Sequence, residues 1–307
     1  MKKVLRILFM VSILLITLNI TIYANSENII EDYDYISKNI ETGEISFDTA
    51  EKYNTNINLM SENWILENGS KKYTLNTNIN NDSPYSLYFL NPMFEVGQRK
   101  VYPYSTVCYI EMTYPNGTTR TGSAVLISDD IALTAGHCVY NHERGGWAES
   151  IRVVPDMFGT IEPYGSTWSK VMHTSEGWVN NENSYKDWAL LELSDPIGYT
   201  SDNQINWNYI RCYQSLTALN DKPVTVTGYP INKGYKMYTA SGLVTSSEME
   251  RFYYDLDTVD GFSGGPVTDT DGKVIGIHSG TLKTDATKKY CVRITEDLFN
   301  YFTSFTD

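Results

Sequence analysis

The stretch Asp260-Gly261-Phe262-Ser263-Gly264-Gly265-Pro266 decides the fold, because it places a serine between glycines. Gly261 and Gly264 permit backbone conformations that a side chain would forbid, and this freedom can expose the Ser263 hydroxyl. The backbone N–H groups of Gly261 and Ser263 could then meet at one point as an oxyanion hole, the pair of donors that stabilises a developing negative oxygen. The same pattern also fits an ordinary glycine turn between two strands, so further signals are needed.

The further signals are a candidate base and a candidate carboxylate upstream of the serine. A serine hydroxyl is a weak nucleophile and needs a base. His137 follows two short apolar runs, 124–127 and 131–133, so it is expected at the end of a buried strand. Asp187 precedes a second apolar run over 188–193, where a carboxylate without a partner would be costly. We therefore expect His137, Asp187 and Ser263 to be the catalytic residues.

Each of these assignments has a structural alternative. His137 could be a core histidine with satisfied hydrogen bonds, and Asp187 could be a strand-end carboxylate that binds backbone amides. Asp195 is the nearest rival acid, but Asp-Pro after a strand is typical of a turn.

The order His, Asp, Ser with these local contexts resembles the chymotrypsin-like serine proteases. Within them the chain is similar to the glutamyl endopeptidases, the V8-like branch secreted by Gram-positive bacteria. The resemblance covers roughly residues 96–305. The motifs that carry it are Val96-Gly97-Gln98-Arg99, Tyr102-Pro103-Tyr104, Pro163-Tyr164-Gly165-Ser166, Gly177-Trp178, Asp195-Pro196-Ile197-Gly198, Tyr254-Asp255-Leu256-Asp257-Thr258 and Gly276-Ile277-His278.

The resemblance implies an all-β, chymotrypsin-like fold of two antiparallel six-stranded barrels. It implies that His137 and Asp187 lie in the first barrel and Ser263 in the second, with the site in the cleft between them. Phe262 stands where most trypsin-like enzymes carry the Asp that pairs with the freed N-terminus. That activation switch is therefore not expected here. The resemblance implies that the new N-terminus lies at the substrate pocket instead.

The resemblance also implies a substrate pocket for an acidic side chain. His278 lies 15 residues after Ser263 and Thr258 lies 5 before it, as in the V8-like pattern. A histidine and a hydroxyl can donate hydrogen bonds to a carboxylate, although His278 could also be an ordinary buried strand histidine. The backbone of Ser279 and Gly280 is expected to pair with an extended substrate. Val96 completes the expected substrate-binding residues.

Composition excludes several other classes of function. The 307 residues are 41% hydrophobic and carry a formal net charge of −13, and no basic run is longer than a pair such as Lys2-Lys3. Clustered Lys and Arg are needed for contact with phosphates, so nucleic-acid binding is not expected. We expect protein or peptide substrates, a monomer, no cofactor and no metal, since no C-x-x-C or H-x-x-x-H spacing occurs. Any structural calcium stays open.

Four cysteines, Cys108, Cys138, Cys212 and Cys291, allow three pairings. Exported proteins permit disulfides. Related enzymes often bridge the cysteine of the Ala-Gly-His-Cys motif to the next strand, and the resemblance makes a Cys108–Cys138 bridge the candidate.

The N-terminal third differs in amino-acid composition from the rest. Lys2, Lys3 and Arg6 precede an apolar run that ends before Ala24, which predicts a signal peptide over 1–24 and secretion to the extracellular space; an uncleaved membrane anchor is the alternative. Residues 25–95 are Asn-rich and acidic with short apolar fragments, which favours a propeptide, or else a loosely ordered extension. The protease domain would be 96–307, and mature enzyme would begin at Val96.

From Val101 short strands alternate with turn residues, which is typical of a sandwich or barrel. The strands are expected at 107–113, 119–127, 151–154, 170–173, 189–193, 224–228, 235–245, 251–256, 273–278 and 290–294. Pro115-Asn116-Gly117 predicts the first hairpin turn. A C-terminal helix should begin after the N-cap Thr295 and dock on the second barrel.

The leading hypothesis is a secreted serine endopeptidase, a zymogen-derived hydrolase that cuts after Glu and less readily after Asp. Two alternatives remain open at this stage. One is a narrow-specificity, toxin-like protease of the same fold, and the other is a non-catalytic adhesin with a protease fold.

Overall fold

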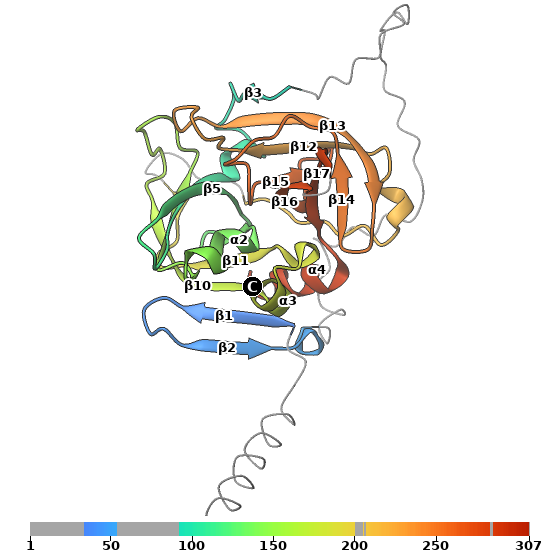
Figure 1. Ribbon diagram of the computed structural model, residues 1–307. Helices are drawn as coiled ribbons and strands as arrows, with labels where there is room; N and C mark the ends of the chain where they lie inside the picture. The colour runs from blue at the N-terminus through green and yellow to red at the C-terminus, as the bar shows by residue number, and fades with distance from the viewer. Residues whose placement is uncertain (1–33, 54–91, 200–204, 206, 283–284, 307) are drawn as a thin grey trace, which may run out of the picture. The chain divides into compact units, whose positions relative to one another are not determined.

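The computed structural model describes residues 34–53, 92–199, 205, 207–282 and 285–306. These residues form two closed antiparallel barrels and a C-terminal helix (Figure 1). The expected signal peptide lies outside the described residues. None of the helices in the described ranges is long and apolar enough to cross a membrane.

The first barrel closes because β11 pairs both with β6 and with β10, giving the order β11-β6-β5-β4-β9-β10. Its six strands are β4 (Val107–Thr113), β5 (Thr119–Leu126), β6 (Ile131–Thr134), β9 (Ser150–Pro155), β10 (Thr167–Ser175) and β11 (Ala189–Leu193).

The second barrel closes in the same way through β12 and β13, with the order β12-β15-β16-β17-β14-β13. Its six strands are β12 (Pro223–Gly228), β13 (Tyr238–Ser247), β14 (Arg251–Tyr254), β15 (Pro266–Thr268), β16 (Val274–Leu282) and β17 (Asp285–Arg293). The two six-stranded barrels confirm the fold class expected from the sequence.

Short elements connect the barrel strands. They are the helices α2 (Gly136–Val139) and α3 (Glu176–Asn181), the strand pair β7 (Tyr140–Asn141) and β8 (Gly146–Trp147), and the single-turn helices η3 (Tyr104–Thr106), η4 (His142–Arg144), η5 (Ser184–Lys186) and η6 (Leu216–Ala218).

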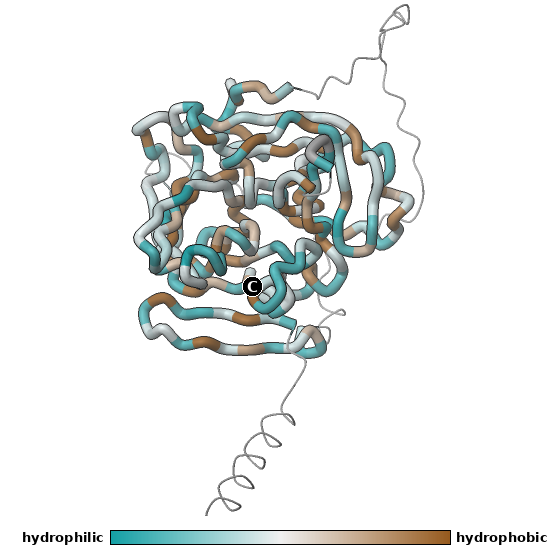
Figure 2. The backbone as a smooth tube through the Cα atoms, viewed as in Figure 1, coloured by the Kyte–Doolittle hydropathy of each residue, from teal (hydrophilic) through white to brown (hydrophobic). Residues whose placement is uncertain are grey.

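The hydropathy of the strands is consistent with barrels whose inner face is buried. Figure 2 shows hydrophobic residues interspersed with polar ones along the strands, as expected where one face of a strand is buried. In β4 the side chains of Cys108, Ile110 and Met112 join the core of the first barrel. Gly117 has φ +79° in the predicted hairpin turn between β4 and β5, a conformation that favours glycine.

The segment expected to be a propeptide contributes strands of its own. The hairpin β1 (Tyr35–Asn39) and β2 (Ile45–Asp48), followed by η1 (Ala50–Lys52), adds β1 to the edge of β10. Tyr35 is buried, with its ring 3.9 Å from that of Tyr301 and 5.6 Å from that of Trp188. Part of residues 25–95 is therefore ordered against the first barrel.

The C-terminal helix α4 (Glu296–Thr303) begins as predicted but docks elsewhere. The Thr295 side chain caps it by accepting from the N–H of Leu298. The expected docking on the second barrel is wrong, because Tyr301 and Phe302 pack on Trp188 of the first barrel. The Tyr301 hydroxyl also bonds His173 Nδ1 at 3.0 Å. Helix α4 thus carries the chain from the second barrel back to the first.

The four cysteines are buried and free, so the candidate Cys108–Cys138 bridge is not formed. Cys108 Sγ points to the carbonyl oxygen of Thr106 at 3.6 Å. Cys138 Sγ instead lies beside Gly122, 3.3 Å from where a Cβ would be. The two thiols therefore serve as small core side chains.

Candidate active site

His137 is held in place by the tight packing of helix α2 on its neighbours. Gly136 leaves no room for a side chain, because a Cβ there would lie 3.0 Å from Trp178 and from Thr174 Oγ1. The Trp178 indole donates to the carbonyl oxygen of Tyr140 at 3.0 Å, which fixes it beside the His137 ring, 6.2 Å away between centroids. The His137 side chain keeps 27% of its surface exposed, so substrate can reach it.

Asp187 lies between η5 and β11 and is almost completely buried. The backbone on either side of it is fixed by β10, since Ser175 Oγ donates to the carbonyl oxygen of Lys186 and Thr174 Oγ1 to that of Trp188. A buried carboxylate needs donors around it, and His137 supplies them. The rival acid Asp195 is exposed instead.

His137 and Asp187 form a two-point contact. The backbone N–H of His137 donates to Asp187 Oδ1 at 2.8 Å, and His137 Nδ1 lies 2.9 Å from Oδ2. Burial lowers the pKa of His137, but the Asp187 carboxylate and, after it, Cys138 together raise it by more, so the pKa lies well above 6.5. The contact leaves Nε2 as the ring nitrogen that faces away from Asp187.

The loop that carries Ser263 requires its glycines. Gly261 has φ +98° and Gly264 has φ +81°. A Cβ on Gly261 would lie 2.3 Å from the carbonyl oxygen of Tyr229, and one on Gly264 would lie 2.0 Å from Thr134 Oγ1. Neither position can hold a side chain without displacing backbone or core, so the glycine signal reflects steric necessity.

Ser123 of β5 ties this loop to the first barrel, and sequence reasoning missed it. Its N–H donates to the carbonyl oxygen of Ser263, and its hydroxyl donates to that of Gly261 at 2.7 Å. The same hydroxyl accepts from the N–H of Tyr229. No local motif marks Ser123 in the sequence; the structure buries it fully, and a buried hydroxyl needs such partners.

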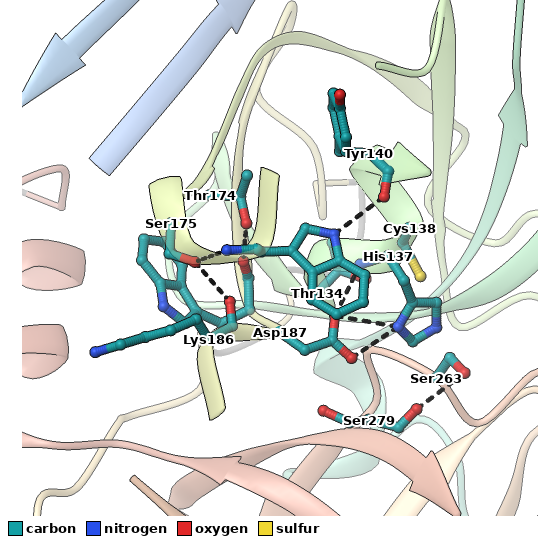
Figure 3. A network of polar contacts seen from close by, with 12 residues as sticks. Thr134, His137, Cys138, Tyr140, Thr174, Ser175, Lys186, Asp187, Ser263 and Ser279 are labelled. Carbon is teal, nitrogen blue, oxygen red and sulfur yellow. Dashed lines mark hydrogen bonds and ion pairs between the residues drawn. The ribbon is translucent and has the colours of Figure 1, made fainter. Parts of the chain in front are cut away.

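The Ser263 hydroxyl lies on the same cleft as His137. Figure 3 shows the His137 ring between the Asp187 carboxylate and the Ser263 side chain. The Ser263 hydroxyl donates to the carbonyl oxygen of Ser279 at 3.5 Å. Within the described ranges, the backbone N–H groups of Gly261 and Ser263 donate to no other group.

His278 lies on β16 directly beside the serine loop. Its carbonyl oxygen accepts from the N–H of Gly264 at 2.8 Å, and its own N–H donates to Gly265. Its Nδ1 lies 2.6 Å from the Tyr254 hydroxyl. Burial, together with the charge of Lys289, lowers the pKa of His278 to about 3, so its ring is neutral near pH 7.

Two buried hydroxyls accompany His278. Thr258 Oγ1 and Ser279 Oγ have no hydrogen-bond partner in the part of the chain that the structure describes. Gly280 has φ +153° and open space around its Cα. An unsatisfied buried hydroxyl calls for an explanation, and a polar ligand is one.

Val96, the last of the expected substrate-binding residues, is not brought to this group. It follows β3 (Phe94–Glu95) and donates its N–H to the carbonyl oxygen of Met237 at 2.9 Å. It packs with Tyr229 and Met237 in a separate small cluster. Among the described residues, no group of three or more His, Cys, Asp or Glu side chains is arranged to hold a metal ion.

Comparison with known proteins finds proteases among the relatives of this chain. The chain is 28% identical over 235 residues to a glutamyl endopeptidase of Bacillus licheniformis, covering 73% of this chain and 71% of that protein. It is 28% identical over 238 residues to an extracellular metalloprotease of Bacillus subtilis, covering 74% and 71%. A glutamyl endopeptidase of Staphylococcus aureus is 27% identical over 186 residues, covering 59% and 53%.

A solved structure of a Glu endopeptidase superposes with a TM-score of 0.61 at 25% identity, covering 70% of this chain and 96% of that one. The resemblance to the glutamyl endopeptidase branch is thereby confirmed. The sequence profile of the trypsin-like peptidase domain matches residues 122–277, just over half of the chain. The chain therefore belongs to the trypsin-like peptidase family, as a serine protease of chymotrypsin-like fold.

Proposed function

We propose that this chain is an endopeptidase in which Ser263, His137 and Asp187 act as a catalytic triad. The observation that carries the proposal is the contact between His137 Nδ1 and the buried Asp187, on the cleft that Ser263 also lines. Ser263 attacks the carbonyl carbon of the scissile peptide bond while His137 Nε2 takes the hydroxyl proton. His137 then gives that proton to the leaving amine, and Asp187 stabilises the imidazolium.

The loop around Ser263 supports an oxyanion hole. The unoccupied N–H groups of Gly261 and Ser263 are the donors that would bind the negative oxygen of the tetrahedral intermediate. Water then hydrolyses the acyl-enzyme through the same groups. Because Ser123 fixes the carbonyl oxygens of both Gly261 and Ser263, the loop is held by barrel contacts before substrate arrives.

We further propose that the residue before the cut bond is Glu, and less readily Asp. A neutral histidine has one donor nitrogen. We assign the Tyr254 hydroxyl as the donor to Nδ1 of His278; the ring proton then lies on Nε2, and this N–H can donate to a substrate carboxylate. The partnerless Thr258 hydroxyl supplies a second donor. Together they satisfy a carboxylate that a neutral pocket would leave unpaired.

A neutral His278 leaves the carboxylate needing a nearby positive charge. In the uncut chain the Val96 nitrogen is a peptide N–H and carries no charge. Lys289 pairs with both Tyr254 and Thr281 in the sheet, and its Nζ donates to Thr281 Oγ1 at 2.7 Å. Its charge reaches His278, where it lowers the ring pKa. Lys289 thus provides positive charge before maturation, and a freed Val96 amine would add more.

His278→Ala should reduce cleavage after Glu by about 10²-fold while cleavage after Gln changes much less, because a lost donor matters most for the charged side chain. The measurement is kcat/KM on two peptides that differ only in Glu or Gln before the cut bond. His142→Ala, an exposed histidine, is the matched control. Equal losses on the two peptides would assign His278 to structure alone.

We also propose that the chain is secreted and that a propeptide is then cut off to give the mature enzyme. The signal peptide over 1–24, the propeptide over 25–95 and a mature start at Val96 follow from composition and from the resemblance, and the relatives support an extracellular place. Glu95 is the residue type that the enzyme is proposed to cut after, so the enzyme could release itself. In the uncut chain Glu95 of β3 pairs with Tyr238 of β13 and forms an ion pair with Lys236. Strand β3 must therefore separate from β13 before the bond after Glu95 can be cut.

N-terminal sequencing of the secreted protein should give Val-Gly-Gln-Arg, the residues that follow Glu95. Glu95→Gln should slow the appearance of this form if the enzyme cuts itself, and added parent enzyme should not restore the rate. A mature form that begins at Asn25 would rule out the propeptide. An unchanged rate in Glu95→Gln would rule out only self-cleavage.

A further inference from the structure

The cleft that holds His137 and Ser263 extends to one side of them. It has a volume of about 530 Å³ and is lined by residues of both barrels, among them Arg120, Arg144, Ile231 and Asp260. Neither Thr258 nor His278, the residues proposed for the side chain before the cut bond, lines it. A substrate that places its acyl part at His278 must therefore lay its leaving part along this cleft.

The cleft continues away from the reacting groups. A second cleft of about 510 Å³ shares Thr121 and Ile231 with it and is also lined by Tyr109 and Tyr235. An extended peptide of several residues after the cut bond would find a continuous surface here, since each residue of a strand spans about 3.3 Å.

Two arginines give the first cleft its charge. The Arg144 guanidinium lies over the ring of Tyr114, 5.4 Å from its centroid, and Arg120 projects from the neighbouring strand β5. Burial raises the pKa of Tyr114, and the positive charges of Arg144 and Arg120 both oppose that rise, so both lie near this one phenol. Tyr114 in turn donates to the carbonyl oxygen of His137 at 3.0 Å.

Neither arginine is paired with a carboxylate in the part of the chain that the structure describes. Arg120 and Arg144 form no ion pair with any carboxylate of the described residues, whereas Arg99, Arg152, Arg211 and Arg251 all do. Asp260 is the one carboxylate among the residues that line the cleft. The chain has a net charge of −13, so two guanidinium groups without a carboxylate partner make the cleft beside Ser263 locally positive on an acidic protein.

We propose that this cleft binds acidic side chains, Asp or Glu, at the first few positions after the cut bond, with Arg120 and Arg144 as the recognising groups. The proposal rests on the function proposed above, because Ser263 defines where the bond is cut. A guanidinium presents its donors in a fork that matches a carboxylate. The enzyme would thus prefer Glu-rich or Asp-rich stretches over isolated acidic residues.

The test uses the full chain with Ser263→Ala, which binds peptides without cutting them. Two fluorescent peptides share one Glu and differ only in carrying Asp-Asp or Asn-Asn directly after it, and anisotropy measures their affinities at low salt. We expect the Asp-Asp peptide to bind about five- to tenfold more tightly, the sum of two partly exposed pairs. Added salt of about 0.5 M should remove most of that difference.

Variants then assign the effect to the two arginines. Adding Arg120→Gln and Arg144→Gln should abolish the preference, and Lys at both positions, which keeps the charge but lacks the fork, should keep only part of it. Lys170→Gln removes an exposed charge of the first barrel away from the cleft and should change nothing. Equal affinities for the two peptides, or a preference that survives in the double Gln variant, would overturn the proposal.

A third peptide fixes the side of the bond. It carries the Asp pair several residues before the Glu, and the double Gln variant should not alter its affinity. Equal weakening of both acidic peptides would overturn the assignment to the leaving side. Failure of the proposed function would appear separately, as absence of hydrolysis by the parent enzyme, which these binding measurements do not use.

Discussion

Ser263→Ala should lower kcat on a Glu-containing peptide by about 10⁶-fold while the protein stays folded, because the hydroxyl is the nucleophile and members of a triad act as a unit. The Ser263 side chain makes one long hydrogen bond, to Ser279 at 3.5 Å, so its loss removes little stability. Steady-state kinetics measures the activity, and near-ultraviolet circular dichroism with thermal unfolding measures the fold. Ser241→Ala, an exposed serine of the second barrel, is the control.

A reagent that acylates or phosphonylates active serines gives an independent reading of the same prediction. Mass spectrometry should find one adduct on Ser263 in the parent protein and none in Ser263→Ala. His137→Ala should also lose the adduct, since the base that activates the hydroxyl is gone. Hydrolysis at the parent rate by Ser263→Ala would contradict the mechanism, and an unlabelled parent would favour the non-catalytic adhesin.

The sequence predicted the barrel strands because short apolar segments are separated by turn residues, glycine among them. Val107–Thr113 and Ala189–Leu193 form strands with the expected bounds, since each has a buried face and defined turns at its ends. The serine loop was predictable for a related reason. Gly261 and Gly264 occupy positions where the structure leaves no room for a side chain. The glycines in the sequence therefore indicate the conformation of the loop directly.

Other features depend on contacts between distant residues and could not be predicted. The hairpin β1–β2 lies in an Asn-rich, polar segment, and only two of its side chains, Tyr35 and Ile36, are buried. Its sequence therefore has no clear strand pattern. Helix α4 shows an apolar face, but its pattern does not say which barrel receives it. That choice depends on Trp188 and on the bond from Tyr301 to His173.

The site residues divide in the same way. The family resemblance implied that His137 pairs with Asp187, and the structure brings them together. Ser123, Arg120 and Arg144 carry no local motif, because a serine in a strand and two arginines in turns or edges are common. Their positions become informative only once the barrels close around the cleft.

Asp187→Asn should lower kcat/KM by about 10⁴-fold, the cost of losing the carboxylate that orients the histidine. The asparagine amide can accept one bond from His137, but it brings an NH₂ donor where Nδ1–H needs an acceptor and provides no charge for the imidazolium. The control is Asp195→Asn, which removes an exposed rival carboxylate and should leave kcat/KM unchanged. A large loss in Asp195→Asn with none in Asp187→Asn would exchange the two assignments.

The same variant should move the pH profile in a direction fixed by the contact. His137 must be neutral to accept the serine proton, so activity rises as pH increases through its pKa. Burial lowers the pKa of His137, and Asp187 together with Cys138 raises it by more, so the acid limb of kcat/KM in the parent should have its midpoint above pH 6.5. In Asp187→Asn the raising charge is gone and burial remains, so the residual activity should have its midpoint at lower pH. An acid limb that stays at the parent's pH in Asp187→Asn would mean that the limb does not report the His137–Asp187 pair.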